Sequence, residues 1–245
     1  MNNEQPSEPY NAHGAYGTPA HASPEGIVSG SLHEGWEAFK RDPVLLVGFF
    51  LLKVAFVVLA SWLLKGGILG DIVYHDESGS LYEFRELIVT ALVALLDGVL
   101  TAGVLFAALH IVRRETAPFM MLFAGFRRFV PLVVVQVITH TLIGFGIVFF
   151  VLPGIFIALA LAQWPFLIMD RRTDILDTIE ASWKMMRGFK TELLLLWLVL
   201  IGINLVGLIP LGLGLIVTVP FTYAVQAAFY ERVLAAQAQA TIPLA

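Results

Sequence analysis

The chain of 245 residues is 58% hydrophobic but only 14% charged, and its mean hydropathy is +0.81. Soluble proteins carry roughly 25% charged residues, so this shortage of charge predicts that lipid covers much of the surface. The chain has no cysteine, which excludes disulfides, Cys-ligated zinc and iron–sulfur clusters. Its net charge of −4 argues against nucleic acid as a partner.

Residues 1–26 are rich in proline, glycine and small polar residues and contain no Lys or Arg. This composition predicts a disordered tail. A single membrane domain is expected over residues 27–232, followed by a short tail over residues 233–245.

Four apolar stretches follow the first tail, and two of them are too long for one helix. A helix of about 40 residues would measure roughly 60 Å, against a hydrocarbon core of about 30 Å. Pro153-Gly154 and the group Pro210, Gly212 and Gly214 mark the expected turns. The sequence therefore predicts six transmembrane helices in three hairpins, at 44–64, 87–112, 130–152, 154–169, 193–209 and 211–230.

Basic residues gather on one side of these spans, as the positive-inside rule expects of cytoplasmic flanks. Twelve of the 15 Lys and Arg fall on that side: Lys40, Arg41, Arg113, Arg114, Arg127, Arg128, Arg171, Arg172, Lys184, Arg187, Lys190 and Arg232. Only Lys65 and Arg85 fall on the other side, in the loop over 65–86. Both termini are therefore expected in the cytoplasm.

An internal repeat supports the three hairpins, because three segments share an aromatic residue, a basic patch and then a span. They read GWEAFKRDPVLLV from Gly35, LFAGFRRFVPLVVV from Leu122 and SWKMMRGFKTELLLL from Ser182. The second span of each hairpin ends in a similar charged string: Arg113-Arg114-Glu115, Asp170-Arg171-Arg172 and Glu231-Arg232. The sequence predicts an all-α fold in which an amphipathic interfacial helix precedes each hairpin.

These interfacial helices are the candidate contacts with lipid headgroups. Ser31 and Glu34 suggest a capping box at the first, and Asp174 precedes the third. Aromatic residues suit the headgroup region, and basic residues attract anionic lipid. The expected contacts are Trp36, Lys40, Arg41, Phe126, Arg127, Arg128, Trp183, Arg187 and Lys190. The alternative is that the helices only space the hairpins.

Lys53 and Asp97 are the only formally charged residues deep within the predicted spans. A charge at the bilayer centre is costly unless it is compensated, and the two spans form one hairpin, so an ion pair is expected. Such a pair is either a structural bridge or part of a path for protons or polar solutes. His140 and Asn204 complete the candidate intramembrane polar site, and Ala94, Gly98 and Ala102 form a small-residue stripe typical of a packing helix.

Motifs of enzymes are missing from the sequence: it has no Walker loop, GxSxG or HExxH string. No two histidines stand three or four residues apart in the spans, so the spacing does not indicate a helical metal pair. No cofactor is expected.

Several strings carry a resemblance to a known group of proteins. They are GWEAFK before the first span, Pro153-Gly154, WPFLIMDRRTDILDTIEASWKMMRG from Trp164, and LGLGLIVTVPFTYAVQAAFYERV from Leu211. The chain resembles uncharacterised six-span bacterial membrane proteins related to the membrane domain of glycerophosphodiester phosphodiesterases. The resemblance implies a bacterial cytoplasmic (inner) membrane and carries over no catalytic residue.

Two functions remain open from the sequence. The leading hypothesis is a non-enzymatic integral membrane protein that scaffolds membrane components or organises lipids, with lipid and either another membrane protein or a second copy as partners. The alternative is a transporter or channel for a small solute or ion that uses the Lys53–Asp97 pair.

Overall fold

A computed structural model describes residues 26–65 and 80–240, and every regular element in these ranges is a helix. In chain order they are α1 (Ile27–Arg41), α2 (Pro43–Leu63), α3 (Ser80–Val112), the 3-10 helix η2 (Phe119–Arg128), α4 (Phe129–Phe149), α5 (Val151–Leu161), α6 (Trp164–Asp170), α7 (Ile175–Met185), α8 (Lys190–Leu208) and α9 (Leu215–Ala240). The predicted disordered tail lies almost wholly outside the described residues, as does most of the 65–86 loop.

Five segments of the described chain are long and apolar enough to cross a membrane. They are Pro43–Leu63, Phe84–Val112, Phe119–Phe149, Val151–Asp170 and Lys190–Leu208. The expectation of an all-α polytopic membrane protein is thereby confirmed. The fourth of these segments is broken at Ala162 and Gln163 into α5 and α6.

The expected sixth span, 211–230, is not among these five. Its helix, α9, begins only at Leu215 and continues to Ala240, well past the expected domain boundary at 232. Gln226 and Glu231 lower its apolar character, and Val225 and Phe229 are fully buried by other parts of the chain. Protein covers this helix between Ala224 and Tyr230, whereas its first turns are partly exposed.

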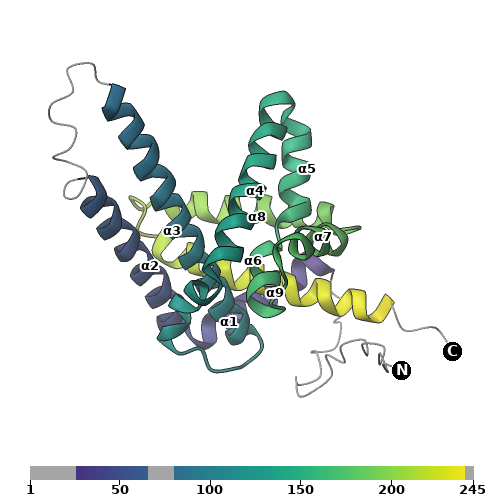
Figure 1. Cartoon of the computed structure of the whole chain (residues 1–245). Coiled ribbons are helices and arrows are strands. Elements are labelled where there is room, and N and C mark those ends of the chain that lie inside the picture. Colours follow the sequence, from purple (N-terminus) through teal and green to yellow (C-terminus); the bar gives the residue numbers. More distant parts are fainter. Residues whose placement is uncertain (1–25, 66–79, 241–245) are drawn as a thin grey trace, which may run out of the picture.

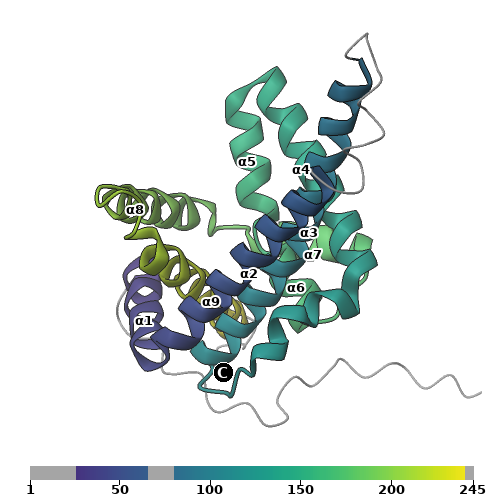
Figure 2. The same ribbon diagram turned by 90° about the vertical axis from the view of Figure 1, so that its left-hand side faces the viewer.

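The third hairpin also lies differently from the other two. In both views α8 and α9 run across the directions of α4 and α5, whereas α2 pairs with α3 and α4 pairs with α5 (Figures 1 and 2). The three hairpins that the repeat suggested are therefore not arranged equivalently. The free ends of the first two hairpins point to one side, and α1 lies towards the other (Figure 1).

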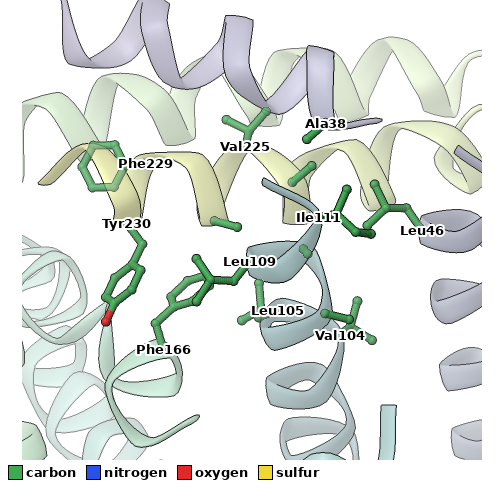
Figure 3. Packing of buried hydrophobic residues seen from close by; sticks show 14 of the residues in the cluster. Ala38, Leu46, Val104, Leu105, Leu109, Ile111, Phe166, Val225, Phe229 and Tyr230 are labelled. Carbon is green, nitrogen blue, oxygen red and sulfur yellow. The ribbon is translucent and has the colours of Figure 1, made fainter. Parts of the chain in front are cut away.

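The main core lies where α9 passes between α1 and α3 (Figure 3). Val225 of α9 faces α1, and a Cβ on Gly35 would lie 2.7 Å from the Val225 Cα, so only glycine permits this approach. On the other side the ring of Tyr230 stacks on Phe166 of α6, with centroids 4.8 Å apart. The apolar face of α1 is thus covered by α9.

Small residues of α3 lie at its close contacts. Of the predicted stripe, Gly98 and Ala102 are packed and Ala94 is exposed, and Gly103 makes a further close contact that the stripe did not include. A Cβ at Gly98 would collide with the side-chain amide of Gln136, and a Cβ at Gly103 would collide with the Leu122 carbonyl of η2. Gln136 also donates a hydrogen bond of 3.0 Å to the carbonyl of Ala94. The polar side chain of α4 is therefore held against the exposed backbone of α3.

Glycine pairs close the other two hairpins. A Cβ on Gly146 would lie 2.7 Å from the Cα of Gly154, and a Cβ on Gly214 would lie 2.7 Å from the Cα of Gly207. The helical path breaks at Phe150, so the turn expected at Pro153-Gly154 was placed too late and Pro153 occupies the first turn of α5. Proline is tolerated there because a first-turn N–H has no partner within the helix.

The predicted capping box at Ser31 was wrong. Helix α1 begins at Ile27, and the Ser31 hydroxyl donates a 2.6 Å hydrogen bond to the Ile27 carbonyl within the helix. Asp174 does precede α7, although its side chain makes no capping bond.

Candidate functional site

Lys53 and Asp97 meet in the structure, at the middle of α2 and α3. The ammonium of Lys53 lies 3.0 Å from Oδ1 of Asp97, and Lys53 also donates a hydrogen bond of 3.3 Å to the hydroxyl of Tyr223. Tyr223 belongs to α9, so the lysine joins three helices. The sequence pattern did not single out this tyrosine, because nothing before folding indicates that α9 crosses the first hairpin.

The two charges differ in exposure. Lys53 is buried, with 8% of its surface exposed, whereas the side chain of Asp97 is 43% exposed. Thr101, one turn further along α3, donates a hydrogen bond of 3.4 Å to the second carboxylate oxygen. Protein therefore surrounds the lysine end of the pair, whereas the aspartate end is exposed.

His140 and Asn204 do not join this pair. The ring of His140 bonds the Gln136 carbonyl of its own helix at 2.7 Å, and the residue is exposed. Asn204 donates a 3.0 Å hydrogen bond to Thr222 and so connects α8 to α9. The predicted intramembrane site therefore reduces to Lys53 and Asp97, with Tyr223 added.

A second charged cluster lies at the C-terminal ends of α3 and α6, beside α9. The sequence pattern did not lead us to predict it. Arg113 holds both oxygens of Asp170, at 2.6 and 3.0 Å, and contacts Glu231 at 2.6 Å. The hydroxyl of Tyr230 donates a 3.1 Å hydrogen bond to Asp170. Arg113, Asp170 and Glu231 belong to the charged strings that close the second span of each repeat. Their equivalent positions in the repeat could have indicated in the sequence that they meet.

Burial and pairing set the ionisation of this cluster. Burial disfavours a charged guanidinium, but Asp170 and Glu231 together raise the pKa of Arg113 above its ordinary value. Burial raises the pKa of Glu231, and Arg113 offsets this only in part, because two carboxylates share one guanidinium. The cluster links three repeats through ion pairs that are largely shielded from solvent.

The three interfacial segments share one pattern of burial. Gly35, Leu122 and Ser182, each just before the aromatic residue, are buried, and so are Ala38, Gly125 and Met185 three residues later. This spacing places one face of every segment against the protein. The repeat inferred from the sequence is thus also present in the packing.

The expected headgroup residues lie mostly on the opposite faces. Trp36 is 47% exposed, Phe126 is 43% exposed and Trp183 is 37% exposed. The expected basic contacts that are exposed are Lys40, Arg41, Arg127 and Arg187, whereas Arg128 and Lys190 are half-buried.

Some of these side chains also have partners within the protein. Lys40 pairs with Glu37 at 2.7 Å, and Arg41 donates a 2.7 Å hydrogen bond to the carbonyl of Ile111. The ammonium of Lys190 lies over the rings of Phe156 and Trp183, 4.8 and 5.6 Å from their centroids. Arg187 is exposed.

In the described ranges no three His, Asp or Glu side chains gather as metal ligands would. Residues 141–237 match a family described as a protein of unknown function, DUF975. The match covers the region from the middle of α4 into α9. Neither a curated protein nor a solved structure matches the chain.

Proposed function

We propose that the protein is a non-enzymatic membrane protein of the bacterial inner membrane that organises lipids or supports other membrane components, with both termini in the cytoplasm. We also propose that the protein is related to the membrane domain of glycerophosphodiester phosphodiesterases. The observation that carries it is the threefold occurrence of a segment with one face packed on the protein and an aromatic, basic face left exposed.

Such a face matches the chemistry of the headgroup region. Aromatic rings fit the boundary between hydrocarbon and water, and each basic side chain near the surface contributes about 1 kcal/mol towards anionic lipid. The packed face fixes the segment on the protein, so the exposed face is already ordered before lipid binds. Little entropy is then lost on binding.

The test compares lipids that remain bound after purification in mild detergent. Trp183→Ala combined with Arg187→Gln should lower the bound anionic lipid by roughly fivefold, the equivalent of about 1 kcal/mol per charge, without changing membrane insertion. Lys184→Gln is the matched control, because Lys184 lies on the same helix but is paired with Glu180. Native mass spectrometry provides the measurement. If the double variant bound as much anionic lipid as the wild type, the segments would only space the hairpins.

A second candidate, a transporter, is favoured by the Lys53, Asp97 and Tyr223 contacts within the spans. Intramembrane ionisable groups often mark paths for ions or polar solutes. Flux of protons or solutes into proteoliposomes that is lost on replacing Lys53 would favour this candidate over the first.

A further inference from the structure

A cavity of about 510 Å³ lies at the end of the first hairpin, between the α1–α2 junction and the loop after α3. Helix α2 begins there at Pro43 and α3 ends there at Val112. The cavity is therefore at the level where the hairpin leaves the apolar part of the membrane. Its volume is within the range of about 300–1,000 Å³ that is usual for small-molecule sites.

Four charged side chains line this cavity, two of each sign. They are Arg41 and Arg114, and Asp42 and Glu115. Arg41 is positioned by its hydrogen bond to the Ile111 carbonyl, and Glu115 lies 3.4 Å from the ring of His110. Among the residues that the structure describes, the side chains of Arg114 and Asp42 have no ionic partner.

Arg114 has a left-handed backbone conformation that arginine rarely adopts. Its N–H bonds the Ile111 carbonyl at 3.1 Å and the next N–H, of Glu115, bonds the His110 carbonyl at 2.8 Å, which closes α3 in a Schellman motif. This motif gives Arg114 a φ of 62°, a conformation that glycine adopts far more readily.

We propose that this cavity binds the headgroup of a zwitterionic phospholipid that carries a phosphodiester and a primary ammonium, namely phosphoethanolamine. The phosphodiester oxygens accept hydrogen bonds from Arg41 and Arg114. The ammonium donates to Asp42 and Glu115. Both signs of charge in the cavity are then neutralised by one ligand.

Other headgroups fit this lining less well. Glycerol in place of the ethanolamine, as in phosphatidylglycerol, leaves the two carboxylates facing a phosphate without compensation. Choline has no N–H to donate, and quaternary ammonium groups are usually held by aromatic rings, which the cavity lining lacks. The proposal concerns a different lipid class from the anionic lipid at the interfacial segments. Of the residues expected to contact anionic lipid, only Arg41 lines this cavity, and the two experiments replace different residues, so either proposal can fail alone.

The ligand is a lipid because the charged lining adjoins an apolar wall. Leu45 and Ala117 line the same cavity, and Val44, the residue before Leu45 on α2, is 81% exposed. The glycerol and the first methylenes of a lipid can follow this wall into the membrane. A soluble phosphoethanolamine would leave the wall in contact with water.

The test is lipid binding to the full-length protein by native mass spectrometry, with phosphatidylethanolamine, phosphatidylcholine and phosphatidylglycerol of identical chains. Arg114→Gly removes the guanidinium yet suits the left-handed backbone, so the fold is retained, and binding of phosphatidylethanolamine should weaken about tenfold. Arg172→Gly is the matched control, because Arg172 has a φ of 54° at the end of α6 and does not line the cavity. Asp42→Asn, which retains a good N-cap residue, should abolish the preference over phosphatidylglycerol.

Three results would each overturn the proposal. One is equal binding of phosphatidylcholine and phosphatidylethanolamine by the wild type. Another is equal loss in Arg114→Gly and Arg172→Gly. The third is displacement of the bound lipid by soluble phosphoethanolamine at the same concentration as lipid, which would show that the apolar wall is not used.

Discussion

Lys53 stands at the centre of α2, where an isolated ammonium would be costly, and it is buried between two partners on different helices. Asp97 provides the opposite charge, and Tyr223 provides a neutral oxygen acceptor and a ring whose centroid lies 5.8 Å from the ammonium. Pairing makes the lysine tolerable at this depth. It also makes the removal of either charge more harmful than the removal of both.

We therefore expect Lys53→Met and Asp97→Leu each to destabilise the protein by a few kcal/mol, because each leaves the other charge unpaired in a low-dielectric site. The double variant should recover much of that loss. Thermal unfolding in detergent measures the recovery, and flux or the cellular phenotype shows whether the recovered protein still works. Additive losses in the double variant would mean that the pair is not energetically coupled.

Arg113 illustrates how a surface-type residue becomes part of the interior. In the sequence it belongs to a basic string at the end of a span, and the positive-inside rule accounts for it fully. In the structure it satisfies Asp170 and Glu231, whose own helices arrive from later repeats. A bidentate guanidinium suits this role because its planar donors match carboxylate oxygens.

At the scale of single elements, small residues decide which helices approach closely. The α4–α5 hairpin depends on Gly146 against Gly154, and α1 reaches α9 through Gly35. In a membrane this close packing is a main source of helix association, because lipid tails are as apolar as leucine and hydrophobicity gives little preference for protein.

Gly146→Ala and Gly144→Ala make a matched pair of tests on α4. The added methyl at Gly146 meets the backbone of Gly154 at 2.7 Å, so this variant should separate the hairpin and lower the melting temperature. At Gly144 nothing lies within 4 Å, and alanine should leave the protein unchanged or stabilise it by up to about 1 kcal/mol. Similar melting temperatures for the two variants in detergent would contradict the packed hairpin.

At the scale of the whole molecule, the two ends of the described chain lie together. Helix α1 packs along α9, and Arg232 pairs with Glu34 at 2.8 Å (Figure 1). Because these helices flank the membrane domain at its two ends, their contact requires both ends to lie on one side of the membrane. This arrangement supports a location of both termini on the same side, and it requires an even number of crossings, so α8 and α9 either both cross the membrane or both lie along it.

Reporter fusions test the topology. A fusion after Glu77, which lies outside the described residues, should appear outside the cell, and fusions after Glu115, Asp177 and Ala245 should appear inside, because arginine-rich segments resist translocation. Alkaline phosphatase and a fluorescent protein provide complementary readouts. An external signal at Asp177 would refute the second hairpin, and one at Ala245 would refute the contact between the two ends.

The sequence by itself determined the features that follow from local composition. Apolar length identified five of the six expected spans, with α2 expected at 44–64 and found at Pro43–Leu63. The Lys53–Asp97 contact was also predictable, because only two formal charges lie deep in the spans and each needs a partner. The repeat register predicted which positions of the three interfacial segments correspond.

The tertiary structure alone decided how the third hairpin lies, where α1 buries its apolar face, and which side chains meet at Arg113. In lipid an apolar helix surface is satisfied equally by acyl chains or by another helix, so hydropathy alone does not show which helices α9 packs against. Which helices pack together is decided by the glycines that permit close contact and by the few charges that must find partners. Tyr223 and Glu231 become part of charged sites only because α9 crosses the first two hairpins.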